Sequence, residues 1–222
     1  MQKINPQKVS KPVGSLIGLK PEYEERYIIL HKNTFPGVLD RIRKSNIRNY
    51  SIFLLDGILF SHFEYIGNDF VADMKAIADP VTKDWWKLTD PMQEPLPARK
   101  KGEWWAEMDL LLCFGENPKS YLKANRFAYT AEIKRGLEKV VKNIFSNFDE
   151  RLKALFVKAN IHNHIVYCKN SKLYVYFEYT GNDFSNDDKE LNSKPMVEKF
   201  NSELGKNLKT QWQQMKEVFH TD

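Results

Sequence analysis

The sequence predicts an α+β fold built from two successive βαββαβ units. Three observations predict it: an octapeptide occurs twice, helix and strand patterns follow in the same order around each occurrence, and a loop-like stretch separates the halves. The octapeptide reads FEYIGNDF at 63–70 and FEYTGNDF at 177–184, so seven of eight letters agree at a spacing of 114 residues. Self-similarity of this kind indicates a repeated structural unit.

Further matches extend the repeat on both sides of the octapeptide. At the same spacing, four residues recur: Asn46, Ile47, Asn49 and Leu59 fall on Asn160, Ile161, Asn163 and Leu173. Nearer the ends, Trp105 and Met108 fall on Trp212 and Met215 at the shorter spacing of 107. We therefore expect a first unit at 13–114, a linker at 115–124 and a degenerate second copy at 125–222.

Each unit begins with a short apolar strand, at about 13–20 and 126–132, and a helical pattern follows. In the first unit Tyr23, Tyr27 and either Leu30 or His31 share one helix face, because residues three or four apart lie about one turn apart. Pro36 interrupts the pattern, and Asn33 or Thr34 is a candidate cap for the next helical segment.

A hairpin comes next in each unit. Strands are predicted at 47–55 and 58–66, joined by Asp56-Gly57, and at 161–168 and 172–180, joined by Asn170-Ser171. A second helix and a final strand, at about 104–114 and 212–219, complete the ferredoxin-like order.

Such a unit covers one sheet face with helices and leaves the other face apolar. We expect the two sheets to pack face to face as an intramolecular dimeric α/β barrel, because separate units would expose large apolar surfaces. The linker sequence GENP at 115–118 has loop character. Assembly beyond this internal pairing is left open by the sequence.

The charge pattern argues against nucleic acid as a partner. The 34 basic and 29 acidic residues are interleaved, and the one compact basic cluster is RKK at 99–101. No apolar run is long enough for a signal peptide or a membrane helix, so we expect a cytoplasmic protein without membrane contact.

Cysteine and histidine spacing gives little indication of a metal. Cys113 and Cys168 belong to no metal-spaced cluster and are expected to be small buried side chains. His162 and His164 would share a strand face, which is a weak metal signal. We expect neither a metal nor an organic cofactor.

The candidate site residues are ambiguous by spacing alone. His31 follows Tyr27 by one turn near a helix end, where a histidine commonly donates to a free carbonyl, so the structural interpretation is favoured there. The adjacent Trp85 and Trp86 cannot both face one core, and a tryptophan at a cleft suits the apolar face of a sugar ring.

Four blocks resemble the L-rhamnose mutarotase family: LKPEYEERYIILHKNTFPGVL, NYSIFL, LFSHFE and DWWKLTDPM. They occur in family order and cover most of 13–114. The resemblance implies a ferredoxin-like fold, an assembly of two such units and interconversion of the α and β anomers of a pyranose. The implied sugar is L-rhamnose or a related 6-deoxy sugar, and the implied reaction uses neither metal nor organic cofactor.

The resemblance also implies roles for five residues. His31 matches the family's catalytic histidine and Tyr50 the tyrosine that works opposite it, while Tyr27, Trp85 and Trp86 match substrate-binding aromatics. Departures from the family pattern bear on which sugar is bound more than on the reaction. They are Phe35 in place of a tryptophan, Lys32-Asn33 in place of Asn-Pro, and the segment 94–103.

The second copy lacks this set and is expected to be a structural partner. At the spacing of 114, Phe145 replaces His31, His164 replaces Tyr50, and Lys199-Phe200 replace Trp85-Trp86. His162, His164 and Tyr174 leave room for a different binding role. Two alternatives to a mutarotase remain open: a non-catalytic sugar-binding module, and another small-molecule enzyme of the same fold, such as a cofactor-free oxygenase.

Overall fold

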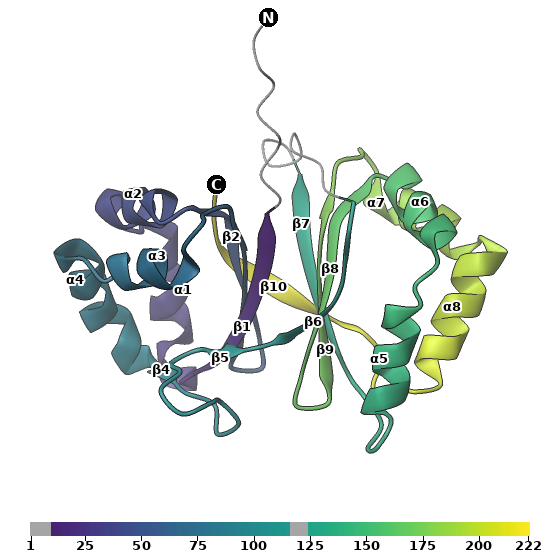
Figure 1. The fold of residues 1–222 in the computed structure, drawn as a ribbon, viewed down its shortest axis with the longest axis horizontal. Coiled ribbons are helices and arrows are strands. Elements are labelled where there is room, and N and C mark those ends of the chain that lie inside the picture. The colour runs from purple at the N-terminus through teal and green to yellow at the C-terminus, as the bar shows by residue number, and fades with distance from the viewer. Residues whose placement is uncertain (1–9, 116–123) are drawn as a thin grey trace, which may run out of the picture.

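The computed structural model describes residues 10–115 and 124–222. Two curved antiparallel sheets occupy the centre of the molecule, and helices lie on both outer sides (Figure 1). The chain is thus an α+β protein of the dimeric α/β barrel type, as the sequence predicts. No helix within the described ranges is long and apolar enough to cross a membrane.

Apart from two short strands, at 93–94 and 106–107, that only the first half contains, the same order of helices and strands occurs in the described N-terminal and C-terminal halves. The N-terminal elements are β1 (Lys11–Leu19), α1 (Glu24–Lys32), α2 (Pro36–Lys44), β2 (Ile47–Leu55), β3 (Ile58–Tyr65), α3 (Phe70–Ala76), α4 (Pro80–Thr89), β4 (Gln93–Glu94), β5 (Ala106–Glu107) and β6 (Asp109–Phe114). The C-terminal elements are β7 (Asn125–Glu132), α5 (Glu138–Ser146), α6 (Glu150–Lys158), β8 (Ile161–Lys169), β9 (Lys172–Tyr179), α7 (Phe184–Asn192), α8 (Pro195–Gly205) and β10 (Gln213–Thr221).

Prolines divide the helical segments. Pro36, Pro80 and Pro195 each occupy the first turn of a new helix, where the missing N–H costs nothing. The second predicted helix of each unit is therefore a pair of helices. Asn33 and Thr34 do not cap α2, which was one prediction. Their side chains donate instead to carbonyl oxygens of α1, at 2.8 and 2.9 Å.

The two hairpins lie where the sequence predicts them. Asp56 and Gly57 join β2 to β3 with φ of 48° and 69°, and Asn170 and Ser171 join β8 to β9 with φ of 51° and 59°. Two successive positive φ angles match the twist of a tight hairpin, and Asp, Asn and Gly tolerate them best.

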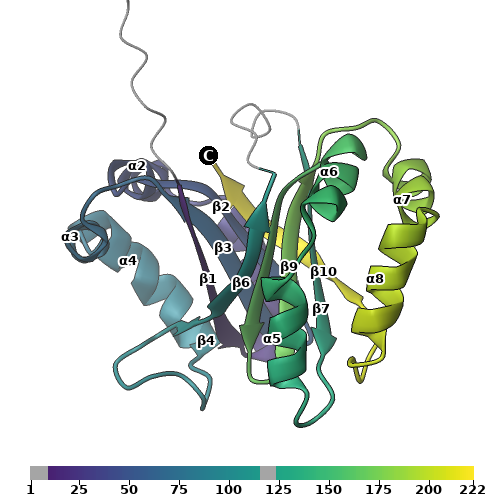
Figure 2. The same ribbon diagram turned by 45° about the vertical axis from the view of Figure 1, so that its right-hand side comes forward.

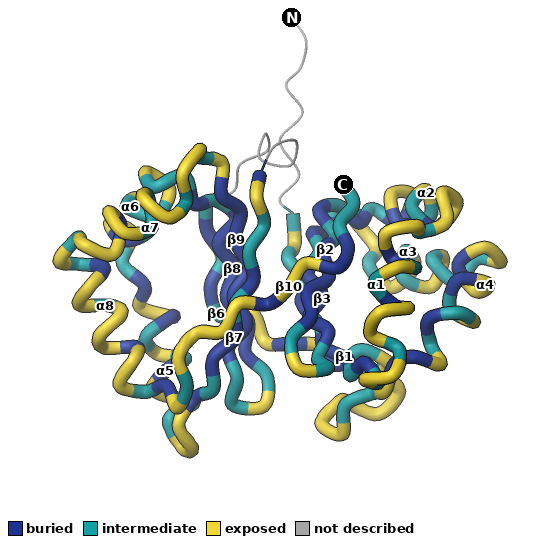
Figure 3. Tube along the Cα trace, turned by 180° about the vertical axis from the view of Figure 1, so that it is seen from behind, coloured by how far each residue is buried: buried dark blue, intermediate teal, exposed yellow. Residues whose placement is uncertain are grey.

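The closing strand of each half joins the sheet of the other half, contrary to the expectation that each unit closes its own sheet. β6 pairs with β8, and β10 pairs with β2. The first residues of β10 also pair with β7, so β10 links the two sheets, as its course between them in Figure 3 illustrates. An alternating strand buries the same residues in either sheet, which is why the pattern alone does not reveal the exchange.

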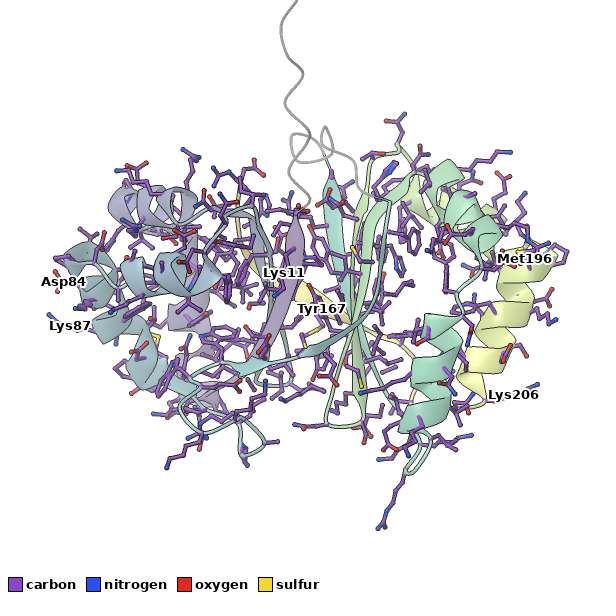
Figure 4. The ribbon with its side chains drawn as sticks, viewed as in Figure 1. Lys11, Asp84, Lys87, Tyr167, Met196 and Lys206 are labelled. Atoms are coloured by element: carbon purple, nitrogen blue, oxygen red, sulfur yellow. The ribbon has the colours of Figure 1, made fainter. Side chains whose placement is uncertain are left out.

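Three apolar clusters form the interior. One lies between the N-terminal sheet and its helices, and one lies between the C-terminal sheet and its helices. Figure 2 shows these two sets of helices on opposite outer sides of the sheets. The third lies between the sheets, where Phe53 and Phe60 meet Tyr167, Tyr174 and Tyr176. Tyr167 accordingly lies at the centre of the molecule in Figure 4. The predicted face-to-face packing is confirmed.

A buried polar contact also crosses between the sheets. Asn49 donates from its side-chain amide to Glu64, at 2.9 Å, and to Glu178 of the other half, at 2.5 Å. The hydroxyl of Tyr176 donates to the Asn49 carbonyl oxygen at 3.0 Å. Neighbouring residues of a strand point to opposite faces. Because the side chain of Asn49 points toward the second sheet, the side chain of Tyr50 lies on the helix side.

Candidate active site

A cavity of about 420 Å³ lies between the N-terminal sheet and helices α1, α2 and α4. The structure brings all five sequence-predicted site residues to its wall: Tyr27, His31, Tyr50, Trp85 and Trp86. Trp104 also lines the cavity and is 44% exposed, so the cavity reaches the surface there. The five residues come from α1, β2 and α4, which only the folded chain brings together.

His31 is held at the end of α1 by its own helix. Its Nδ1 lies 3.0 Å from the backbone carbonyl oxygen of Tyr27, one turn earlier. A carbonyl oxygen only accepts, so Nδ1 carries the proton and Nε2 carries the lone pair. The bond is the one that a structural histidine would make, and it also fixes the tautomer.

The electrostatics of His31 favour a neutral ring. Burial lowers the pKa of His31 to about 4, and the hydrogen bond to the Tyr27 carbonyl opposes this shift. The imidazole is therefore uncharged at neutral pH. No described residue hydrogen-bonds Nε2, which leaves that nitrogen as an acceptor in the cavity wall.

Aromatic rings enclose the imidazole. The ring of Tyr27 stacks on it with centroids 3.9 Å apart, and the edge of Trp85 lies at 5.2 Å. Phe219 from β10 lies edge-on at 5.6 Å. The ring of Tyr50 lies 5.4 Å from the same phenylalanine. His31 and Tyr50 therefore flank one aromatic ring that the C-terminal strand supplies.

The two tyrosines remain protonated phenols. Burial raises the pKa of Tyr50. Burial also raises the pKa of Tyr27, the nearby Tyr50 raises it further, and a hydrogen bond from Gln93 acts in the opposite direction. Each hydroxyl therefore carries a proton to donate at neutral pH.

A short hydrogen-bond chain orients the Tyr27 hydroxyl. Trp104 Nε1 donates to Gln93 Oε1 at 2.9 Å, which fixes the orientation of the Gln93 amide. Gln93 Nε2 then donates to Tyr27 Oη at 3.4 Å. Because Oη accepts from Gln93, its own proton is available to a ligand.

Both adjacent tryptophans line the cavity, although the sequence suggested that one would face elsewhere. Trp85 is buried, with its edge toward Phe35 at 5.2 Å, and Trp86 is half-buried. Successive helix positions differ by about 100°. The cavity is wide enough to contact both indoles, so α4 supplies one buried indole, Trp85, and one half-buried indole, Trp86.

Sequence reasoning missed several lining residues. They are Thr34, Asp90, Gln93, Trp104, Trp105 and Phe219. The second adjacent tryptophan pair, 104–105, carried the same signal as the first and could have been found. Phe219 could not, because its place depends on the strand exchange.

The C-terminal half brings together a different set. Phe145, His164 and Phe200 line a separate cavity of about 300 Å³. His162 lies on the same strand as His164 and is half-buried. Within residues 10–115 and 124–222, no group of three or more histidine, cysteine or acidic side chains could hold a metal ion.

Comparison with known proteins gives a family match for the N-terminal half and a fold match for the whole chain. Residues 13–111 match the family model described as L-rhamnose mutarotase. No curated protein matches the chain. A solved candidate monooxygenase from Lactobacillus acidophilus NCFM is similar with a TM-score of 0.59 and 8% identity, covering 95% of each chain.

Two further solved structures resemble the whole chain. A candidate monooxygenase from Fusobacterium nucleatum subsp. nucleatum has a TM-score of 0.56 and 14% identity, covering 95% of this chain and 94% of that one. An anthrone oxidase-like protein has a TM-score of 0.51 and 7% identity, covering 97% and 92%. At such identities the likeness shows the fold, with both halves included.

Proposed function

We propose, from the match of residues 13–111 to the L-rhamnose mutarotase family model, that the N-terminal cavity interconverts the α and β anomers of a pyranose. The observation that carries the proposal is that His31 and Tyr50 flank the ring of Phe219 on the wall of one cavity. Trp85 and Trp86 line the same space, where an indole can contact the C–H face of a sugar.

The reaction needs one proton acceptor and one proton donor. Ring opening removes the proton from the anomeric hydroxyl, breaks the bond between C1 and the ring oxygen, and places a proton on that oxygen. Rotation about C1–C2 and the reverse transfers close the ring as the other anomer. Every atom and electron is returned, so acid–base help alone suffices, and such help typically contributes about 10² to 10⁴-fold.

We assign the acceptor role to His31 and the donor role to Tyr50. Neutral His31 presents the Nε2 lone pair, because its Nδ1 proton is committed to the Tyr27 carbonyl. The raised pKa of Tyr50 keeps its phenol protonated, so it can donate toward the ring oxygen. Closure returns both protons and restores both groups for the next turnover.

The lining supports a 6-deoxy sugar such as L-rhamnose. The Tyr27 hydroxyl offers a hydrogen bond to a sugar hydroxyl, with Gln93 behind it. Val38, Ile42 and Ile52 present apolar surface on the same wall. A methyl group at C6 gains from contact with such surface, whereas a hydroxymethyl group there would lose hydrogen bonds to water.

The test follows anomer exchange by saturation-transfer NMR on L-rhamnose, with L-fucose and other sugars as a panel. We expect His31→Gln and Tyr50→Phe to slow exchange at least 100-fold while sugar affinity changes only a few-fold. Tyr129→Phe, which removes a hydroxyl from the other cavity, is the matched control. Normal exchange in both site variants would overturn the proposal.

The same measurement separates the alternatives. A non-catalytic sugar-binding module would shift the sugar resonances without exchanging them. An enzyme with another small-molecule substrate would leave the sugar resonances of the whole panel unshifted. The chain resembles candidate monooxygenases in fold, so the absence of any sugar binding is an outcome that the experiment should record.

We further propose that 13–114 and 125–222 are two copies of one unit and that only the first carries the mutarotase site. The matching hydrogen bonds support the duplication: Tyr65 donates to Asp73 at 2.6 Å and Tyr179 to Asp187 at 2.7 Å. Apart from its two end residues, the linker expected at 115–124 lies outside the described residues. Separately expressed halves that each exchange anomers would contradict this division.

A further inference from the structure

The second cavity differs in chemistry from the first. It measures about 300 Å³ and lies between the C-terminal sheet and helices α5, α7 and α8. Six phenylalanines line it: Phe145, Phe148, Phe156, Phe177, Phe184 and Phe200. Such a wall offers ring faces and edges, which pack well against another aromatic ring.

One polar side chain lies among these rings. His164 on β8 is 9% exposed, and its Nδ1 is fully buried without a hydrogen-bond partner. Its imidazole is parallel to the rings of Phe114 and Phe177, with centroids 4.9 and 5.9 Å away, and Phe156 meets it edge-on at 5.2 Å. Nδ1 is thus covered by protein atoms, whereas the imidazole lines the cavity and no described residue hydrogen-bonds its Nε2. Buried polar atoms are normally paired, so an unpaired Nε2 in a cavity wall indicates a ligand contact.

The other polar side chains of the lining are less buried: Tyr129 and Asp188 are half-buried, and Asn192 and Asn201 are exposed. Asp188, Asn192 and Asn201 border the cavity, and Asn201 donates to the side-chain oxygen of Asn192 at 2.8 Å. Trp212 lies beside them and is 38% exposed. The described lining includes no lysine or arginine to balance an anion, and an apolar interior disfavours any charge.

We propose that this second cavity binds an uncharged planar aromatic molecule that carries a hydroxyl group, with the hydroxyl hydrogen-bonded to His164 Nε2. A phenolic hydroxyl both donates and accepts, so it satisfies this nitrogen in either tautomer. A sugar does not fit, because most of its several hydroxyls would face phenylalanine rings rather than polar atoms. The two halves therefore bind different classes of small molecule.

The five tryptophans of the chain separate the two cavities. Trp85, Trp86, Trp104 and Trp105 line the first cavity, and Trp212 lines the second. In protein labelled with 5-fluorotryptophan, ¹⁹F NMR gives one resonance for each, and Trp212→Phe assigns the fifth. We expect 2-naphthol to shift the Trp212 resonance alone.

The hydrogen bond is tested with matched ligands and one variant. Naphthalene, which lacks the hydroxyl, should bind at least ten-fold more weakly than 2-naphthol to the unaltered protein. His164→Phe should remove this preference and leave naphthalene affinity unchanged. If that variant does not fold, the ligand pair on the unaltered protein still decides.

Two results would overturn the inference. One is a Trp212 resonance that 2-naphthol leaves in place or shifts only together with the other four. The other is equal affinity for naphthalene and 2-naphthol on the unaltered protein. Neither result bears on anomer exchange in the first cavity, so the two proposals fail independently.

Discussion

The rings of His31 and Phe219 lie 5.6 Å apart although they come from opposite ends of the chain. Phe219 belongs to β10, which leaves the C-terminal half and pairs with β2. The same ring lies 5.4 Å from Tyr50. The C-terminal half thus completes the wall of the N-terminal cavity, and it does more than support the fold.

Replacing Phe219 with leucine should slow the proposed anomer exchange. Leucine keeps most of the apolar contact, so the free energy of unfolding should fall by no more than about 1.5 kcal/mol. Losing the flat ring between His31 and Tyr50 lets both side chains move, which we expect to lower kcat/KM at least ten-fold. Saturation-transfer NMR and urea unfolding measure the two effects.

Phe177→Leu is the control for this variant. Phe177 and Phe219 are each 7% exposed, but Phe177 lines the other cavity. We expect a similar loss of stability in this variant and unchanged exchange. Equal rates in the two variants would show that Phe219 has no special role.

The pH profile should report the unusual His31 pKa. Burial lowers this pKa to about 4, so Nε2 keeps its lone pair from neutral pH down to about pH 5. We expect kcat/KM to be flat over that range and to fall toward lower pH with a midpoint near 4, as protonation removes the acceptor. Exchange rates of His31→Gln at each pH provide the background, because acid itself catalyses ring opening.

A midpoint near 6.5, the ordinary histidine value, would mean that His31 is solvated in the free enzyme, whose pKa values the kcat/KM profile reports. A profile without an acid limb would remove His31 from the acceptor role. Either outcome is distinguishable from unfolding by recording the far-UV circular dichroism at the same pH values.

The fold was predictable where the signals are local. Asp56-Gly57 and Asn170-Ser171 mark tight hairpins because Asp, Gly and Asn tolerate positive φ, and both hairpins are found at those positions. The strand exchange was not predictable, because period-2 burial does not say which sheet a strand joins. Asn33 and Thr34 resemble caps in sequence but bond back to α1.

The site was predictable only in part for the same reason. His31 and Tyr27 are one turn apart, so their contact follows from helix geometry. Their approach to Tyr50 and Trp85 depends on how α1, β2 and α4 pack. The sequence indicated that these residues share a site only through the family resemblance. Phe219 required the tertiary structure.

Gly14 should be sensitive to substitution because the two sheets approach closely there. A Cβ at Gly14 would lie 2.8 Å from the ring of Tyr167 and 2.9 Å from the side chain of Met108. Tyr167 is fully buried and hydrogen-bonded to His62 at 2.9 Å, so it has little room to move. We expect Gly14→Ala to lower the free energy of unfolding by about 1–3 kcal/mol in urea titrations.

Gly205 offers the matched control. It ends α8, and a Cβ there would meet nothing within 4 Å. Gly205→Ala should leave stability unchanged or raise it by up to about 1 kcal/mol, because it restricts the unfolded chain. A Gly14→Ala variant as stable as this control would contradict the close packing of β1 against β8.

Gln93 should affect sugar binding more than the chemical step. Its amide accepts from Trp104 and donates to the Tyr27 hydroxyl, so it orients a group that we expect to hold the sugar. Gln93→Leu keeps the size of the side chain but leaves Trp104 Nε1 without its acceptor and Tyr27 Oη without its donor. Since neither His31 nor Tyr50 bonds to Gln93, we expect KM for L-rhamnose to rise about ten-fold while kcat stays within three-fold of its original value.

Gln214→Leu on the exposed face of β10 serves as the control. A fall in kcat with unchanged KM would instead place Gln93 in the proton transfers, and the roles of Tyr27 and Tyr50 would have to be exchanged.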